Sequence, residues 1–298
     1  MTYNTMKKIN TLRTNTYGAG LVVYNPSGNM FASSGLLPGS VTIWDPNDGR
    51  ILHHFTSINE IISAIDFSPD GSTFVTGGNQ TGICIRNTQN WEISRVLPGH
   101  QGRIFHIAFS PDGHVIASSS YADEAIRLWD LDSAQQSVLS PLGRFAFVPK
   151  SSTIAVHRDN KISFYNYHTG TLLNEKRLDC AEAVKFSFHP DGSMLAIESE
   201  DGRIKIWETK EMTLRNKLSY RLETGRSPVF SPNGKVIAVT YIESSSIVLW
   251  DSDTGLQVDT GMGSSDTSDS ICFSPDGAKL ICSGGGRLGG VIDIWQLE

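Results

Sequence analysis

The chain has no run of consecutive apolar residues that approaches the ~18 needed for a membrane-spanning helix. Its first residues, Met1–Lys8, lead into no apolar segment of signal-peptide length. The first absence argues against insertion into a membrane, and the second argues against export. From both we expect a soluble, cytoplasmic protein with no membrane partner.

Cysteine occurs at only four positions, Cys84, Cys180, Cys272 and Cys282, and no two of them have the CxxC spacing of structural zinc sites. We therefore expect no metal site, and we interpret the cysteines as free thiols in a reducing compartment. Cys272 and Cys282 fall on what should be neighbouring strands. The sequence leaves open whether these two side chains interact.

Basic residues are outnumbered, with 25 Lys+Arg against 31 Asp+Glu and a formal net charge of -6. Proteins that bind nucleic acid directly carry basic clusters that neutralise phosphates. The charge balance therefore disfavours direct nucleic-acid binding. A locally basic face remains an alternative, and with it a place in a nucleic-acid-associated assembly.

Motifs of catalysis are also missing, since neither a Gly-x-Ser-x-Gly elbow nor a His-Glu-x-x-His helix occurs. Residues 284–289 have the spacing Gly-x-Gly-x-x-Gly, but a dinucleotide site needs a helix after this loop. Val291–Trp295 reads as a strand instead. We therefore interpret residues 284–289 as a hairpin loop and expect no catalytic residue and no cofactor.

What the chain does have is a repeat marked by proline. Phe67–Gly71 and Phe109–Gly113 both read Phe-Ser-Pro-Asp-Gly, and Phe273–Gly277 repeats them. The prolines in this register are Pro26, Pro69, Pro111, Pro149, Pro190, Pro232 and Pro275. Their steps of 38 to 43 residues are typical of propeller or solenoid units, and seven units fill almost the whole chain.

Each unit reads as short strands separated by turns. In the third unit Ile104–Phe109 and Val115–Ser118 flank the turn Ser110–Gly113, in which proline, aspartate and glycine favour a tight reversal. Ala125–Asp130 supplies a third strand, and a fourth run follows a further polar turn. No segment has a sustained helical period. Four antiparallel strands repeated radially predict an all-β, seven-bladed propeller that occupies residues 1–298 as a single domain.

The aromatic residue of the third strand is Trp in most units, and Trp44-Asp45, Trp129-Asp130 and Trp250-Asp251 share a Trp-Asp pair. With these pairs and Gly99-His100, the whole chain resembles the WD-repeat (WD40-type) β-propeller family. The resemblance implies a buried, hydrogen-bonded structural tetrad in the third unit. Its members are His100, Asp123, Trp129 and either Ser118 or Ser119, and we assign Ser118.

Two units depart from the family pattern. Arg86-Asn87 replaces the Trp-Asp pair in the second unit, and Phe147–Lys150 replaces the usual turn in the fourth. The last unit ends after its third strand at Trp295–Glu298, which would leave a strand edge unpaired. We predict that Lys7–Arg13 supplies the missing fourth strand and closes the ring.

In the resembled family, partners commonly dock on the face formed by the loops that lead into the first strands and by those that join the second and third strands. Counting back from each repeat proline marks that rim, and tyrosine and arginine there are residue types that anchor interfaces. The candidate partner-binding residues are Tyr17, Glu60, Arg103, Tyr121, His157, Arg158, Glu182, Arg226, Tyr241, Asp269 and Arg287.

The sequence thus predicts a non-catalytic protein–protein interaction scaffold, a subunit that holds other proteins in a complex. Fold alone says little about function, so this expectation rests on the family resemblance. The alternative is a propeller enzyme of the lyase or lactonase type, with a metal-dependent site at the axial channel. The eight histidines are spread over several units, which weighs against that alternative.

Overall fold

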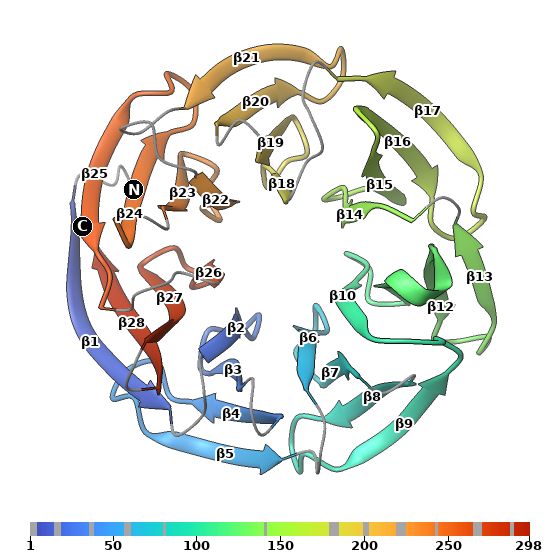
Figure 1. Cartoon of the computed structure of the whole chain (residues 1–298), viewed down its shortest axis with the longest axis horizontal. Coiled ribbons are helices and arrows are strands. Elements are labelled where there is room, and N and C mark those ends of the chain that lie inside the picture. The colour runs from blue at the N-terminus through green and yellow to red at the C-terminus, as the bar shows by residue number, and fades with distance from the viewer. Residues whose placement is uncertain are drawn as a thin grey trace.

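The computed structural model shows seven four-stranded antiparallel sheets arranged as blades around a central axis (Figure 1). Residues 5–14, 19–35, 39–56, 61–79, 82–139, 142–178, 185–198, 203–218, 225–241, 244–264, 270–286 and 289–298 are described, without the side chains of residues 225–227 and 286. The prediction of a seven-bladed propeller with four antiparallel strands in each blade is confirmed.

The first four blades follow one another along the chain, each built from the axis outward. Blade one contains β2 (Ala19–Tyr24), β3 (Phe31–Gly35), β4 (Ser40–Trp44) and β5 (Ile51–Thr56). Blade two contains β6 (Ile62–Phe67), β7 (Thr73–Gly78), β8 (Gly82–Asn87) and β9 (Ile93–Pro98). Blade three contains β10 (Ile104–Phe109), β11 (Val115–Ser120), the 3-10 turn η1 (Tyr121–Asp123), β12 (Ala125–Asp130) and β13 (Gln136–Leu139). Blade four contains β14 (Arg144–Phe147), β15 (Thr153–Arg158), β16 (Lys161–Asn166) and β17 (Leu172–Arg177).

The remaining blades continue the pattern, and the last one takes its outer strand from the N-terminal end of the chain. Blade five contains β18 (Phe186–Phe188), β19 (Met194–Glu198), β20 (Ile204–Glu208) and β21 (Thr213–Leu218). Blade six contains β22 (Gly225–Phe230), β23 (Val236–Tyr241), β24 (Ser246–Asp251) and β25 (Gln257–Met262). Blade seven contains β26 (Ser270–Phe273), β27 (Lys279–Gly286), β28 (Gly289–Leu297) and β1 (Met6–Thr14).

Ring closure by the N-terminal strand is confirmed, because β1 pairs antiparallel with β28 from Met6 opposite Leu297 to Thr14 opposite Gly290. β1 also reaches both neighbouring blades. The backbone N–H of Met6 donates to Asp259 of blade six at 2.6 Å. Leu12 packs so closely on blade one that a Cβ on Gly49 would lie 2.4 Å from its Cδ2. The strand therefore links three blades.

The repeat turns form as their composition predicts. In six blades the glycine two residues after the repeat proline has a positive φ, for example 72° at Gly71 and 77° at Gly113. Blade four has no glycine there, and Lys150 takes the left-handed conformation instead, with φ 56°. A Cβ on Gly113 would lie 3.5 Å from the ring of Pro69, so this turn rests on the proline turn of the preceding blade, and Gly28 and Gly71 lie against Pro275 and Pro26 in the same way.

Apolar side chains fill the seams between adjacent blades. Trp129 of blade three packs with Ile83 and Leu97 of blade two, and Trp295 of blade seven packs with Ile247 of blade six. The strand-three tryptophan therefore belongs to the seam with the preceding blade. Because every blade buries both faces, the β-strands that form these seams are almost continuously apolar.

The two cysteines of blade seven lie on opposite faces of its sheet. Cys282 stands opposite Ile271, not Cys272, in the strand register. Cys282 packs in the seam with blade six, whereas Cys272 packs in the seam with blade one. Neither forms a disulfide with a described residue, and the same holds for Cys84. The two side chains therefore do not bridge.

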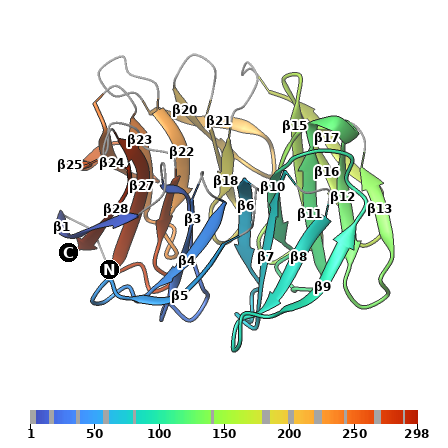
Figure 2. The same ribbon diagram turned by 60° about the horizontal axis from the view of Figure 1, so that its bottom comes forward.

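The strand register defines two faces of the ring, which Figure 2 shows from the side. Ile104, which begins β10, stands opposite Ser120, which ends β11. The loops before the first strands and after the second strands therefore share one face, called here the top face. The repeat turns lie on the opposite, bottom face.

No helix among the described residues is long and apolar enough to cross a membrane.

Candidate functional site

The structure describes five of the eleven candidate partner-binding residues completely. Tyr17, Glu60, Glu182, Asp269 and Arg287 lie outside the described residues, and for Arg226 only the backbone, in β22, is described. The remaining candidates are Arg103, Tyr121, His157, Arg158 and Tyr241.

His157 and Tyr241 lie at the top ends of β15 and β23, but their side chains are 2% and 1% exposed. Tyr241 packs in the apolar seam between blades five and six. Burial lowers the pKa of His157 to about 4, so the imidazole is neutral at physiological pH. The repeat pattern of the sequence correctly placed these residues at the top-face ends of their strands. It could not show whether their side chains point to solvent or into the blade. They belong to the blade interior.

Arg103 and Tyr121 are exposed. Tyr121 and Arg144 both contact Phe105, and we call these three residues together with Arg103 the blade-three patch. Tyr121 is 65% exposed and stacks on Phe105, with centroids 4.2 Å apart and an interplanar angle of 22°. The Arg144 guanidinium lies 5.1 Å from the same ring. Arg103 Nε donates to Ser63 Oγ of blade two at 3.1 Å. Arg158 is also exposed, but it pairs with Asp159 beside it.

Phe105 and Arg144 were not among the candidates chosen from the sequence. A β-bulge in β10 explains why Phe105 was missed. The pairing of β10 with β11 shifts register between Ile104 and His106. A bulge places two residues of one strand opposite one of its partner, so strict alternation fails there. Phe105 and His106 are consequently both half-buried beside the axis. Arg144 begins β14 next to them, and no local motif marks it.

The innermost strands of all seven blades line an axial channel of about 380 Å³. Its wall is mainly apolar, and its described ionisable residues are Asp66, His106, Arg144 and Lys185. His106 stacks on Phe145 at 4.1 Å. Burial, together with the charges of Arg144 and Lys185, lowers the pKa of His106 to about 3. The imidazole is therefore neutral, and the two cations dominate this side of the channel.

Asp66 is the carboxylate of the channel wall. Its oxygens accept backbone N–H groups from Phe109 at 2.8 Å and from Phe67 at 2.9 Å. Burial nevertheless raises the pKa of Asp66 from 3.8 to about 7. Because the folded state holds this proton more tightly than the unfolded chain, the contribution to stability is complete below pH 4. It is lost as the pH rises to about 7.

Asp66→Asn is expected to remove this pH dependence. The shift of about three pH units corresponds to roughly 4 kcal/mol, and we expect about 2 kcal/mol because the side chain is only partly buried. Urea unfolding of both proteins from pH 4 to pH 8 measures it. The wild-type protein should lose about 2 kcal/mol relative to the variant over that range. A difference in unfolding free energy that stays constant with pH would contradict the assignment.

The four residues matched to the family tetrad are joined by hydrogen bonds in blade three. His100 Nδ1 bonds the Asp123 carboxylate, and His100 Nε2 lies 2.6 Å from Ser118 Oγ. Trp129 Nε1 donates to Ser118 Oγ at 2.8 Å. The carboxylate of Asp123 also accepts from Arg127 Nε at 2.9 Å. Since the side chains of His100 and Asp123 are 0% and 1% exposed, the network has no access to a substrate.

In the other blades the tryptophans keep at most one hydrogen bond of the blade-three tetrad among the described residues. Trp44 Nε1 keeps its serine acceptor, Ser33, at 2.8 Å in blade one. Trp207, Trp250 and Trp295 have buried indole N–H groups without an acceptor among the described residues. In the register of β19, β23 and β27 the serine position is taken by Ile197, Val239 and Cys282.

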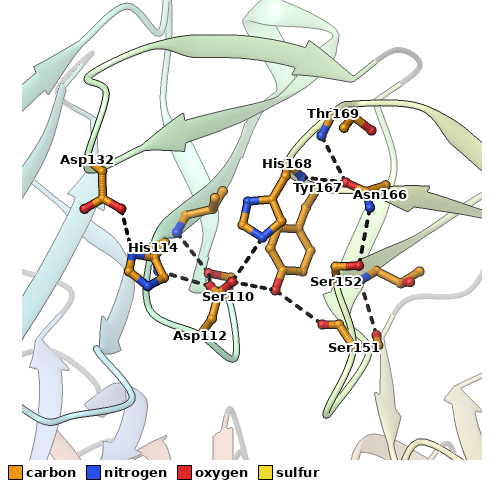
Figure 3. Close-up of polar contacts among 12 residues, drawn as sticks. Ser110, Asp112, His114, Asp132, Ser151, Ser152, Asn166, Tyr167, His168 and Thr169 are labelled. Atoms are coloured by element: carbon orange, nitrogen blue, oxygen red, sulfur yellow. Dashed lines mark hydrogen bonds and ion pairs between the residues drawn. The ribbon is translucent and has the colours of Figure 1, made fainter.

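On the bottom face a polar network joins blades three and four, as Figure 3 shows. Asp112, in the repeat turn of blade three, accepts from Tyr167 Oη at 3.0 Å. His168 Nε2 lies 3.1 Å from the same carboxylate. Burial and the neighbouring Asp112 raise the pKa of Tyr167 to about 12, so it remains a donor. These contacts tie two blades together, and they are interpreted as structural.

Within the described part of the chain, no group of three or more His, Cys, Asp or Glu residues is arranged to hold a metal ion. The segment interpreted as a hairpin loop is largely strand, because Gly284, Gly285 and Gly286 end β27 and pair with Val291, Gly290 and Gly289 of β28. No helix follows it to receive a phosphate.

These features define a β-propeller whose third blade contains a buried hydrogen-bonded tetrad and whose top face carries the exposed residues of the blade-three patch. The family model for the WD domain, G-beta repeat, matches residues 49–85, 91–130 and 178–208. With the repeated Trp-Asp pairs and the seven-bladed fold, this match shows that the chain is a β-propeller containing repeats of the WD type.

Similar proteins include two with aligned regions of moderate length. A p21-activated protein kinase-interacting protein 1-like protein of Danio rerio is 24% identical, over 75% of this chain and 61% of that protein. The pre-mRNA-processing factor 19 of Bos taurus is 29% identical, over 54% of this chain and 33% of that protein. The chain thus spans less than two thirds of these relatives.

Among solved structures, the β-propeller domain of Cps50 (Swd1) from Myceliophteria thermophila superimposes with a TM-score of 0.87. The alignment covers 99% of this chain and 100% of that chain, at 15% sequence identity. At this identity the likeness supports the fold and does not extend to partners.

Proposed function

We propose that residues 1–298 form one propeller that acts as a non-catalytic scaffold and holds partner proteins in a cytoplasmic assembly. The WD-type repeats support a protein-binding role, since propellers built from such repeats typically bind other proteins. The relative named for its interaction with p21-activated protein kinase supports the same role. The pre-mRNA-processing relative leaves open the nucleic-acid-associated assembly considered above.

The blade-three patch is the observation that carries this proposal. Tyr121 presents a ring that is 65% exposed, yet its orientation is held by stacking on Phe105. Tyrosine and arginine are enriched among residues that dominate binding energy. A side chain that is already ordered loses less conformational freedom when a partner binds. The patch therefore offers a preformed anchor on the top face.

The charges of the patch indicate what kind of partner surface would fit it. Arg144 provides a guanidinium group beside the aromatic pair, the exposed Arg103 stands two residues before Phe105 in the chain, and Lys185 lies further along the channel wall. The chain as a whole carries a net charge of -6, so this cationic cluster runs against the overall charge. We propose that the partner contributes an apolar side chain that packs on Tyr121, flanked by carboxylates. Complementary charges of this kind accelerate association and select partners.

The triple variant Arg103→Glu/Tyr121→Ala/Arg144→Glu is expected to lose its partners while remaining folded. Loss of one aromatic anchor and reversal of two charges should reduce partner recovery at least about tenfold. The measurement is affinity purification from the native cells, with mass spectrometry and a melting curve for each protein.

The matched control is Arg50→Glu/His114→Ala, which changes exposed residues of the bottom face. This control is expected to recover the same partners as the wild-type protein. Equal recovery of partners by the folded triple variant would contradict docking on the blade-three patch of the top face. Loss of partners in the bottom-face control alone would place docking on the other side of the ring.

A further inference from the structure

Blade two lacks the tryptophan that fills the seam in five other blades, and the space is only partly refilled. Arg86 occupies its position in β8, opposite Phe74 of β7. Trp91, in the following turn, takes a φ of 61° and packs on Phe55 of blade one. A cavity of about 210 Å³ remains, the blade-two pocket. Its lining includes Phe55, Ile62, Thr76, Arg86, Ile93 and Val96.

Arg86 brings a positive charge into this pocket without a matching anion. Its guanidinium lies 4.2 Å from the centroid of the Phe55 ring, and its Nη1 donates to the Trp91 carbonyl at 3.0 Å. Its Nε is buried and has no acceptor among the described residues. Among the described residues, the ionisable group that acts on its charge is the Cys84 thiol and not a carboxylate. The cation–π contact compensates only part of the lost hydration.

The lining determines what could complete the site. Phe55, Ile62, Ile93 and Val96 give apolar walls, and the hydroxyl of Thr76 and the thiol of Cys84 add two polar groups. Pockets that hold drug-sized ligands begin at about 300 Å³, so this one is suited to a group the size of a side chain. A carboxylate can accept from the two terminal nitrogens of one guanidinium side by side. A phosphate would leave several oxygens against apolar walls.

We propose that the blade-two pocket binds a carboxylate on a short branched or unbranched aliphatic stem. The carboxylate pairs with Arg86, and the stem packs on Phe55 and Ile93. Such a group belongs either to a glutamate side chain of a partner protein or to a free short-chain carboxylic acid. This site lies at the seam of blades one and two, and it is independent of the proposed docking on the blade-three patch.

The test follows the Arg86 Nε–H signal by NMR during titration with 3-methylbutanoate. The expected result is a saturable shift of this signal and a melting temperature raised by about 3 °C at ten times Kd. The uncharged isostere 3-methylbutanamide should cause neither change. A second titration with a blocked Ala-Glu-Ala peptide separates the two sources, since a side-chain site that is open to partners should also shift with the peptide.

Arg86→Met should abolish the response to 3-methylbutanoate, whereas Arg86→Lys should keep part of it. The matched control Arg95→Gln, on the adjacent strand β9 and outside the pocket, should respond like the wild-type protein. Equal shifts with acid and amide, an unchanged response in Arg86→Met, or no shift with any probe would overturn the proposal.

Discussion

Deletion of residues 1–16 is expected to yield a protein that unfolds or aggregates at temperatures where the full chain is stable. The deletion removes β1, which supplies the outer strand of blade seven and contacts blades six and one. It also removes Thr11 Oγ1 and Lys8, which donate to and pair with the buried carboxylate of Asp293 at 2.7 and 3.7 Å. An unpaired β28 edge then becomes available to other chains.

The expected loss exceeds about 5 kcal/mol, which is comparable to the whole stability of a typical domain. Size-exclusion chromatography and thermal unfolding followed by circular dichroism measure it. Two controls change the same region without removing the strand: deletion of residues 2–4, and Ile9→Ala, whose side chain is 46% exposed. Both should melt close to the wild-type protein. A monodisperse deletion protein with an unchanged melting temperature would show that β1 does not hold the ring closed.

Ser118→Ala is expected to destabilise the protein by about 3 kcal/mol. The Ser118 hydroxyl is the partner of both Trp129 Nε1 and His100 Nε2, so its removal leaves two buried polar groups unpaired. Each such group costs about 1–3 kcal/mol. Because His100 also bonds Asp123, the loss should spread to the turn that holds Asp123.

The neighbouring serine provides a matched control. Ser119 is equally buried, but its hydroxyl has no partner among the described residues. Ser119→Ala should therefore be neutral or stabilising by up to about 1 kcal/mol. Urea unfolding of the two alanine variants side by side gives the comparison. Equal destabilisation by both would mean that cavity formation, and not the hydrogen-bonded network, determines the cost.

The part of the fold that could be predicted from the sequence is the part that local chemistry specifies. The repeat prolines and the glycines after them act within their own turns, and six of the seven turns formed as predicted. Ring closure was predictable because the strand that ends at Trp295–Glu298 would otherwise expose an edge of unpaired backbone groups. Lys7–Arg13, which precedes the first blade, has the length to pair with that edge, as β1 does.

The parts that could not be predicted depend on geometry between distant residues. The bulge after Ile104 turns Phe105 toward the axis, and no residue type in β10 marks it. The burial of Tyr241 follows from the seam between blades five and six, not from its place at a strand end. The contact between Asp112 and Tyr167 joins two turns 55 residues apart, each of which looks like an ordinary solvent-exposed loop in the sequence.

Blade two shows how one substitution reorganises a seam. The replacement of tryptophan by Arg86 was visible in the sequence, but its consequence was not. Trp91 sits where blades one, four and six have Gly49, Gly170 and Gly255, at a left-handed turn position that β-branched and bulky residues rarely adopt. Its ring packs on Phe55, Phe67 and Phe74 and so restores part of the apolar seam.

Site-specific photo-crosslinking tests the central claim, docking of partner proteins on the top face, most directly. A photoreactive p-benzoylphenylalanine is placed at position 121, at the exposed Tyr121, or at position 114, at the exposed His114 of the bottom face. After irradiation in the native cells, we expect covalent adducts with partner proteins from position 121 and none from position 114. Adducts from position 114 with none from position 121 would contradict it.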